Sequence, residues 1–215
     1  MKFTLLHPSR GRAQKARETA MYWIEKSSGK HEIEHIYSLD SSDPDVSKYK
    51  TINHLMVNDN SCVVEATNHA AKTATGDILI YLSDDFKCPD KWDLEIIQQL
   101  QLKLDRDDGL WLLKVDDCLQ AFPVPVLTIP IMSRELYKRL GYFWYPEYRS
   151  MFVDEDLYWV TRTNGWMIEA PELKFPHEHC TLGLAERDET YMRSERNWDQ
   201  GKALFAKRRA AGFAL

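Results

Sequence analysis

Two groups of acidic residues and one pair of histidines have the residue types and spacing for chemistry. Asp84 and Asp85 follow Ser83 directly after the apolar run 78–82, and a second acidic group, Asp154-Glu155-Asp156, lies farther along the chain. Adjacent carboxylates repel each other unless a cation or a shared proton offsets their charge. A hard divalent ion such as Mg²⁺ or Mn²⁺, which also bridges to a substrate phosphate, would provide that cation at Asp84-Asp85. The alternative is a turn in which serine and aspartate side chains cap the backbone.

The second acidic group and the histidines also leave two interpretations open. Three acids at the start of a helix are favoured by the helix dipole, whether or not they act on a substrate. The histidines, His177 and His179, are two residues apart. In an extended segment such residues point to the same side, so both could reach one ion. Either group could be a functional site or a structural feature.

The elements around these residues predict an α/β fold with a largely parallel sheet and helices on its faces. Alternating apolar patterns predict strands over 3–7, 33–39, 54–57, 78–82 and 110–115, and helices over 13–26, 62–75 and 92–104. This order is typical of open α/β sheets, which bind ligands beyond the carboxyl ends of their strands. Asp84 and Asp85 stand at such an end.

The second half of the chain is less regular. Pro123, Pro125 and Pro130 interrupt an extended segment, and Ser133 is expected to cap a short helix that ends at Leu140. An aromatic loop over 143–151 follows, then a helix over 154–164, a strand over 166–170 and one charged helix over 188–211. We expect a single domain over 1–215.

Composition narrows the class of protein further. The net charge of −5 argues against a nucleic-acid-binding protein, because phosphate contacts favour a basic face. The four cysteines are far apart and form no C-x-x-C pair, which predicts reduced thiols in a cytoplasmic protein. No signal peptide or stretch of about 20 apolar residues is evident, so no integral membrane segment is expected. The sequence does not indicate the oligomeric state.

The order of these features resembles the inverting glycosyltransferases of the GT-A fold, the family-2-like group that uses nucleotide-diphosphate sugars. The resemblance runs from about residue 3 to residue 180. It implies that the segment Pro8-Ser9-Arg10-Gly11-Arg12 contacts the nucleotide, that Asp40 holds the base, and that Asn68–Asp77 leads into the metal-binding D-x-D strand. Ser83-Asp84-Asp85 falls on the D-x-D position, with serine in place of the first acid. Asp85 then corresponds to the direct metal ligand, and Asp84 to a ribose or metal contact.

The later segments match the acceptor side of the same family. Asp154-Glu155-Asp156-Leu157, followed by Arg162 and Gly165-Trp166-Met167-Ile168, resembles the segment that carries the catalytic base. The resemblance implies Asp154 as the base and Asp156 as the reserve, although Val153 replaces the usual preceding Glu. His177 matches the late histidine that completes the metal or diphosphate site, and His179 is its candidate companion.

The resemblance implies a metal-assisted glycosyltransferase with Mn²⁺ or Mg²⁺, a nucleotide-diphosphate sugar donor and a carbohydrate or other hydroxyl acceptor. Residues 1–115 would be the nucleotide-binding half, 116–185 the acceptor and catalytic half, and 186–215 a C-terminal helical segment. Arg10 or Arg12 would assist at the phosphates. The aromatic residues 142–145 would either stack against an acceptor sugar or cover the core.

Two alternatives remain open. A sugar-nucleotide pyrophosphorylase would show a glycine-rich loop after the first strand, where this chain has only Gly11. A non-catalytic nucleotide- or carbohydrate-binding module derived from a transferase is favoured by Ser83, which weakens the metal motif.

Overall fold

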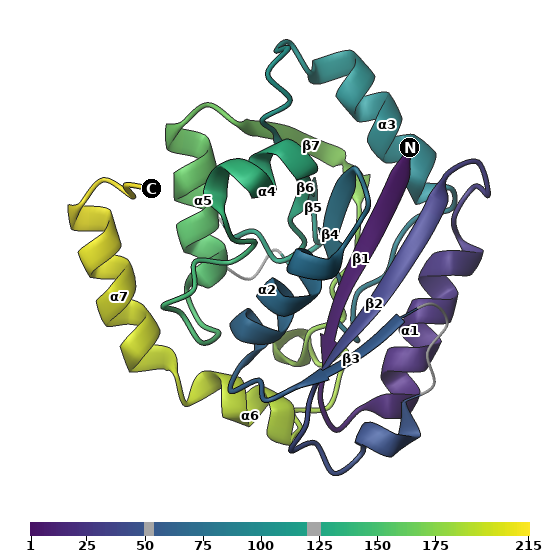
Figure 1. Cartoon of the computed structure of the whole chain (residues 1–215), viewed down its shortest axis with the longest axis vertical. Helices are drawn as coiled ribbons and strands as arrows, with labels where there is room; N and C mark the ends of the chain where they lie inside the picture. Colours follow the sequence, from purple (N-terminus) through teal and green to yellow (C-terminus); the bar gives the residue numbers. More distant parts are fainter. Residues whose placement is uncertain (50–53, 120–125) are drawn as a thin grey trace.

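The computed structural model describes residues 1–49, 54–119 and 126–215, which form a seven-stranded sheet in the order β3-β2-β1-β4-β6-β5-β7 (Figure 1). The strands are β1 (Lys2–Ser9), β2 (Glu32–Asp40), β3 (His54–Asn58), β4 (Ile78–Tyr81), β5 (Leu112–Asp116), β6 (Ile131–Ser133) and β7 (Met167–Lys174). β6 is antiparallel to its neighbours β4 and β5, and the other strand pairs are parallel. The predicted mostly parallel sheet is therefore confirmed.

Helices flank this sheet in the order that the sequence pattern predicts. They are α1 (Ala13–Glu25), α2 (Val63–Thr73), α3 (Trp92–Lys103), α4 (Arg134–Leu140), α5 (Val153–Thr163), α6 (Glu189–Glu195) and α7 (Trp198–Ala210), with short 3₁₀ turns at Val46–Lys48 and Cys180–Leu182. Ser133 caps α4 as expected, because its side chain accepts a hydrogen bond from the Leu136 backbone N–H. None of the helices in the described part of the chain is long and apolar enough to cross a membrane.

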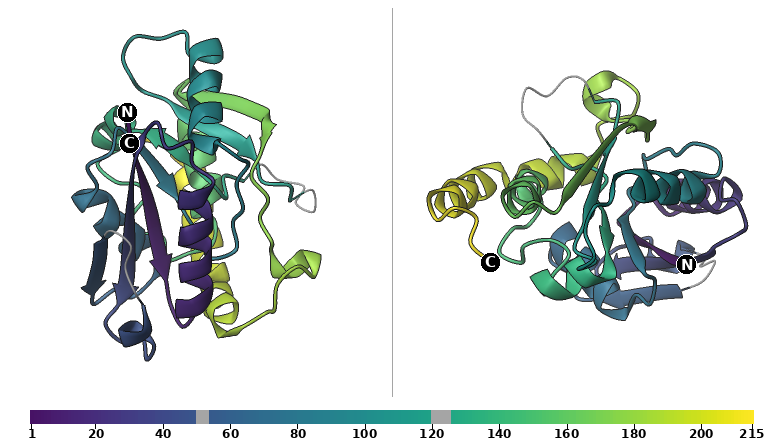
Figure 2. Two further views of the ribbon diagram at one scale, coloured as in Figure 1. Left: turned by 90° about the vertical axis from the view of Figure 1, so that its right-hand side faces the viewer. Right: turned by 90° about the horizontal axis from the view of Figure 1, so that it is seen from above.

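The sheet separates two hydrophobic layers. Side chains alternate between its faces, so Leu79 of β4 packs into one cluster and Ile78 and Ile80 into the other. α2, α4 and α5 cover the first face, and α1 and α3 cover the second (Figure 2). Because both faces of β4 are covered, its residues Ile78, Leu79 and Ile80 are fully buried, as its continuous apolar run predicts.

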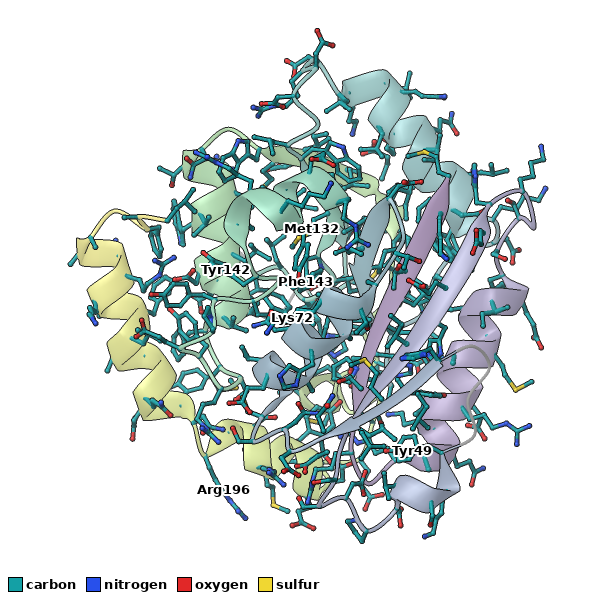
Figure 3. All side chains as sticks on the ribbon, in the orientation of Figure 1. Tyr49, Lys72, Met132, Tyr142, Phe143 and Arg196 are labelled. Atoms are coloured by element: carbon teal, nitrogen blue, oxygen red, sulfur yellow. The ribbon has the colours of Figure 1, made fainter. Side chains whose placement is uncertain are left out.

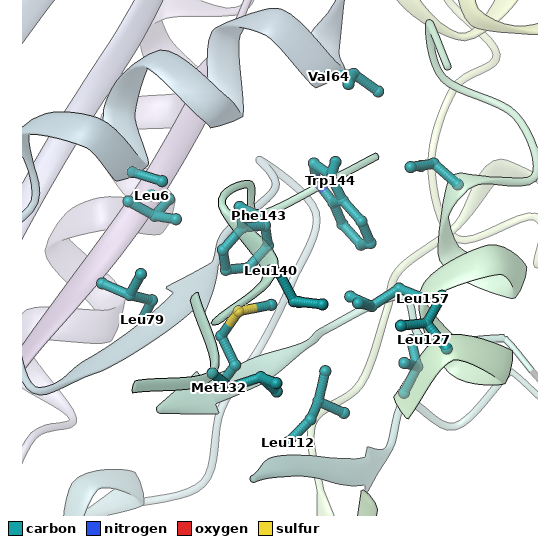
Figure 4. Packing of buried hydrophobic residues seen from close by; sticks show 14 of the residues in the cluster. Leu6, Val64, Leu79, Leu112, Leu127, Met132, Leu140, Phe143, Trp144 and Leu157 are labelled. Atoms are coloured by element: carbon teal, nitrogen blue, oxygen red, sulfur yellow. The ribbon is translucent and has the colours of Figure 1, made fainter. Parts of the chain in front are cut away.

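The first layer contains part of the aromatic segment that the sequence offered as an acceptor platform. Phe143 is 0% exposed and Trp144 is 3% exposed. Figure 4 shows both rings among Leu140, Met132 and Leu157, inside the cluster. Their apolar surface is thus already buried against the core, so of the two interpretations left open for residues 142–145, these two rings follow the one in which the aromatic residues cover the core.

Two element boundaries differ notably from the sequence-based prediction. β1 continues to Ser9, pairing Pro8 with Ser38 and Ser9 with Leu39, so Pro8 and Ser9 lie in a strand rather than in the expected loop. The predicted single helix over 188–211 is two helices. The Asn197 side chain donates to the carbonyl oxygens of Arg193 and Ser194 at 3.3 and 3.4 Å, which competes with helix continuation between α6 and α7. Pro123 and Pro125 lie outside the described residues.

Candidate active site

The candidate site lies at the edge of the sheet where β1, β2 and β4 end. Because these strands are parallel neighbours, Asp40 at the end of β2, Arg10 after β1 and the Ser83–Asp85 segment after β4 lie at one edge of the sheet. α6 lies at the same edge, at the lower end of the strands in Figure 1. This is the position at which open α/β sheets bind their ligands.

Asp84 points into a buried polar network instead of toward solvent. Asp84 is 4% exposed. Its two carboxylate oxygens accept hydrogen bonds from His7 Nε2 and Ser9 Oγ, both at 2.9 Å. The His7 Nδ1 in turn shares a 2.9 Å hydrogen bond with His35 Nε2. The Tyr49 hydroxyl, labelled in Figure 3, lies 3.0 Å from Ser9 Oγ. With both oxygens occupied, Asp84 anchors the strand ends, and its expected nucleotide contact stays a prediction.

Asp85 turns toward the outer part of the site. Its Oδ2 accepts a hydrogen bond from the Tyr191 hydroxyl and lies 3.4 Å from His177 Nε2. Burial alone would raise the pKa of Asp85, but its interactions with His177, Tyr191 and Ser83 outweigh burial and hold the pKa below its usual range. Asp85 is therefore a buried carboxylate that keeps its negative charge.

A short extended segment carries the two histidines past Asp85. The Glu178 backbone N–H donates to the Asp85 carbonyl oxygen at 2.9 Å, and His177 forms an antiparallel bridge with Phe86. The rings of His177 and His179 are 4.8 Å apart and nearly perpendicular. His179 Nδ1, however, is 2.8 Å from the Thr181 hydroxyl. The segment thus directs His177 toward the Asp85 carboxylate and the Nδ1 of His179 toward Thr181.

The site provides part of the ligand set for a divalent cation. Within residues 1–49, 54–119 and 126–215, no three His, Cys, Asp or Glu side chains form a group that could hold a metal ion, so the expected trio of Asp85, His177 and His179 is not formed. Asp85 and His177 still have atoms that could bind a divalent cation. Asp85 Oδ1 and His177 Nδ1 are buried and have no hydrogen-bond partner in the described structure. A magnesium-type ion needs only one or two protein ligands when phosphates and water supply the rest.

The residues expected at the nucleotide are paired with acids. Arg10 donates to Asp40 Oδ2 at 2.7 Å and to Ser42 Oγ at 3.0 Å. Arg12 forms two 2.6 Å hydrogen bonds to the Asp188 carboxylate, and its NH1 lies 3.9 Å from Asp84. Both arginines therefore stand at the site with acidic partners in place.

The second acidic group separates into different environments. Asp156 is 1% exposed and accepts hydrogen bonds from Arg208 at 2.9 and 3.1 Å and from the Tyr148 hydroxyl at 3.1 Å. Asp154 has no such ion pair among the described residues. Burial raises the pKa of Asp154, although backbone N–H groups at the start of α5 partly oppose the rise.

Sequence reasoning missed the residues that α6 brings to the site. Asp188, Tyr191 and Arg193 contact Arg12, Asp85 and Asp40, respectively. Asp188 is also the α6 N-cap, since its side chain accepts a hydrogen bond from the Tyr191 backbone N–H. An aspartate before a helix is a usable signal for that cap. Nothing in the local sequence indicates a contact with an arginine 176 residues away.

Comparisons with known proteins show similarity to solved structures but no match to a sequence family. No family model matches the chain, and no curated protein matches it in sequence. A fragment of TarS from S. aureus in complex with UDP-GlcNAc matches with a TM-score of 0.65 and 15% identity, over 90% of this chain and 61% of that one. The mannosyltransferase PcManGT from Pyrobaculum calidifontis, in complex with GDP-Man and Mn²⁺, matches with a TM-score of 0.60 and 16% identity, over 81% and 56%.

A third structure extends the fold comparison. Drosophila β-1,4-galactosyltransferase 7, a mutant in complex with manganese, UDP-Gal and xylobiose, matches with a TM-score of 0.55 and 12% identity, over 87% of this chain and 81% of that one. The chain therefore has the GT-A fold of nucleotide-sugar transferases, as its resemblance implies. It spans 61% of the TarS fragment and 56% of PcManGT.

Proposed function

We propose that the protein is a glycosyltransferase that moves a sugar from a nucleotide-diphosphate donor to an acceptor hydroxyl. The observation that carries the proposal is the pairing of Asp85 with His177 at the strand-end edge of a GT-A sheet. Structural neighbours in complex with UDP-GlcNAc, or with GDP-Man and Mn²⁺, support a nucleotide sugar as the donor. We assign donor binding to residues 1–115 and acceptor binding to 116–185, with a carbohydrate or other hydroxyl compound as acceptor.

In this proposal Asp85 and His177 would hold a divalent cation, Mn²⁺ or Mg²⁺, whose positive charge stabilises the leaving diphosphate when it is bound. Arg12 and Arg10 would donate fork-like hydrogen bonds to phosphate oxygens. Asp40, at the end of β2, would contact the nucleoside. Asp84 and Ser9 would act by fixing the strand ends on which these residues stand.

Asp154 is the proposed general base. The acceptor hydroxyl gives its proton to the Asp154 carboxylate as its oxygen attacks the anomeric carbon from the face opposite the diphosphate. One such displacement inverts the anomeric configuration. The raised pKa of Asp154 makes it a stronger base than an ordinary carboxylate. Asp156 is less suited, because Arg208 and Tyr148 occupy its carboxylate.

Thermal-shift measurements with UDP, GDP and dTDP, each with and without Mn²⁺, test the donor site. A ligand that binds only the folded state raises the melting temperature, so one nucleoside diphosphate with Mn²⁺ should stabilise the protein. Asp85→Asn should remove the part of this stabilisation that needs Mn²⁺. Asp107→Asn is the matched control, because Asp107 is exposed on the loop between α3 and β5.

The two alternatives predict different results. If nucleotide binds and transfer to every acceptor tested is absent, the protein is a non-catalytic binding module. If no nucleotide binds with or without Mn²⁺, the transferase proposal is wrong. Release of pyrophosphate from a nucleoside triphosphate and a sugar phosphate would identify a pyrophosphorylase. The cytoplasmic location expected from the cysteines stays a prediction.

A further inference from the structure

The segment formed by Asp188 and α6 contacts the proposed donor site at several points. Asp188 binds Arg12, and the Thr190 hydroxyl donates to the Arg10 carbonyl oxygen at 3.1 Å. Tyr191 binds Asp85, and Arg193 lies 3.7 Å from Asp40. Together these contacts reach the four residues that we assign to the phosphates, the cation and the nucleoside: Arg10, Arg12, Asp40 and Asp85.

The Asp188 contact has the geometry of an arginine–phosphate contact. Arg12 Nε and NH2 each donate a 2.6 Å hydrogen bond to one Asp188 oxygen. This bidentate arrangement is the one in which guanidinium groups bind either carboxylates or phosphates. Asp188 therefore occupies the Arg12 donor atoms that a donor phosphate would use.

The Tyr191 contact has the corresponding relation to a cation. Its hydroxyl donates to Asp85 Oδ2, the carboxylate oxygen that also faces His177. Its ring lies under the Arg12 guanidinium, with 4.6 Å between the guanidinium carbon and the ring centroid. One side chain thus contacts both the proposed cation ligand and the proposed phosphate ligand.

Apart from these contacts, α6 is held by a 2.9 Å hydrogen bond from the Ser150 hydroxyl to the Ser194 carbonyl oxygen and by the Tyr191 ring, which lies 5.1 Å from the His179 ring. α6 has seven residues and none of them is buried. Elements with little buried apolar surface open at low free-energy cost. A helix of this kind can leave the site when a ligand with stronger charges takes over its contacts.

We propose that Asp188 and Tyr191 are internal competitors of the donor: the Asp188 carboxylate occupies a phosphate subsite on Arg12, and the Tyr191 hydroxyl occupies Oδ2 of Asp85, the carboxylate oxygen that faces His177, so that only Oδ1 is left for a cation. This inference rests on the proposed function, because it takes a nucleoside diphosphate and a divalent cation as the ligands. Donor binding then requires α6 to leave, so these residues set the donor affinity from outside the predicted binding motifs.

Two conservative substitutions test the competition separately. Asp188→Asn removes the negative charge that Arg12 binds, and Tyr191→Phe removes the hydroxyl while keeping the ring. The apparent dissociation constant scales inversely with the population of the open state, so Asp188→Asn should tighten UDP or GDP binding in saturating Mn²⁺ roughly threefold to tenfold. Tyr191→Phe should lower the Mn²⁺ concentration that half-saturates binding by about threefold. Isothermal titration calorimetry measures both.

Glu189→Gln is the matched control. It removes one negative charge from the neighbouring exposed residue, and it should leave both affinities unchanged. Hydrogen–deuterium exchange gives a readout independent of affinity. Backbone amides of α6 should exchange faster when UDP or GDP and Mn²⁺ saturate the protein.

Three results would overturn the inference. Equal nucleotide affinity in the wild type, Asp188→Asn and Tyr191→Phe means that α6 does not compete. Weaker binding in the variants, or slower α6 exchange with nucleotide bound, means that α6 closes over the donor and helps to hold it. Absence of nucleotide binding in the wild type and both variants removes the proposed function along with the inference, whereas the first two results leave that function intact.

Discussion

The two acidic groups of the candidate site, Asp84-Asp85 and Asp154-Glu155-Asp156, have a similar arrangement but are anchored by different residues. In each group one acid is buried against fixed partners, Asp84 in the first and Asp156 in the second. In each group another acid, Asp85 or Asp154, is left for the site. Asp84 is held by His7 and Ser9, from the neighbouring strand β1. Asp156 is held by a cation, Arg208, from the helix α7.

This difference indicates how each half of the site depends on the rest of the fold. The first anchor belongs to the central sheet, where β1 and β4 are hydrogen-bonded neighbours. The second depends on α7, a peripheral helix that Figure 1 shows on the outer side of α5. The Arg208 guanidinium also stacks on the Tyr145 ring, with 3.8 Å between the guanidinium carbon and the ring centroid, so an aromatic side chain packs against this ion pair. The proposed donor side is thus anchored by the sheet, and the proposed acceptor side by a helix 52 residues farther along the chain.

The largest expected effect concerns the two acids of the second group. Asp154→Asn should lower the transfer rate by about 10³-fold, because it removes the proposed general base. Nucleotide binding should stay within about twofold of wild type, since the proposed donor ligands are untouched. Steady-state kinetics and calorimetry measure the two quantities. If Asp156→Asn lowers the rate as much as Asp154→Asn with no loss of stability, the two acids do not divide their roles as described.

The next effect tests the α7 anchor. Arg208→Met should lower the free energy of unfolding by about 3 kcal/mol, because it leaves Asp156 buried without its cation. Urea denaturation measures the change. Arg209→Met, at the exposed neighbouring position, should cost less than about 0.5 kcal/mol. In the double variant Asp156→Asn, Arg208→Met much of the loss should return, and its persistence would mean that the charge pair is not the cause.

The sheet anchor should be less sensitive. His7→Phe removes the donor to Asp84 Oδ1 and should lower the free energy of unfolding by about 2 kcal/mol, the cost of an unsatisfied buried acceptor. Ser9→Ala should cost about 1 kcal/mol, the value of a typical single hydrogen bond. Chemical denaturation again measures both. A larger loss for His7→Phe than for Arg208→Met would reverse the order of the two anchors.

The smallest effect concerns Glu155, which lies between the two acids of the second group. Burial and the neighbouring Asp154 charge raise its pKa from 4.5 to about 7. The folded state therefore disfavours the charged form, and its stability falls as the pH rises from about 4.5 to 7. Glu155→Gln removes this penalty, so it should add about 0.5 kcal/mol at pH near 8, a value reduced for solvent screening, and nothing at pH near 4. Unfolding at both pH values checks the sign, and an equal gain at both would contradict it.

The sequence indicated the sheet well because its signals are local. The apolar run before Asp84 predicted a strand buried on both faces, and the alternation of strands and helices predicted a parallel sheet. The sequence did not indicate which acid of a pair would turn inward, because that depends on partners such as His7 and Arg208. His7 lies 77 residues from Asp84 along the chain. The end of β1 was also placed too early, since pairing with β2 carries the strand through Pro8 and Ser9.

In the C-terminal part, too, the sequence did not indicate features that depend on contacts between distant residues. A charged composition predicted a helix over 188–211, and helix is what forms on both sides of Asn197. The break and the contact of α6 with Arg12 depend on tertiary contacts that leave no periodic signal. Phe143 and Trp144 were ambiguous for a related reason, because an aromatic run has the same composition in a ligand platform and in a core.

The Arg208–Asp156 ion pair also has a consequence for how the chain folds during its synthesis. His7 and Ser9 are translated before Asp84, so the partners of that carboxylate are already present when it is made. Arg208 is translated 52 residues after Asp156. At about 5–20 residues per second, Asp156 waits roughly 3–10 s for its cation. During that interval residues 1–115, the proposed nucleotide-binding half, are already synthesised, while α5 cannot yet bury its aspartate as an ion pair. The two halves of the site should therefore mature in sequence on the ribosome.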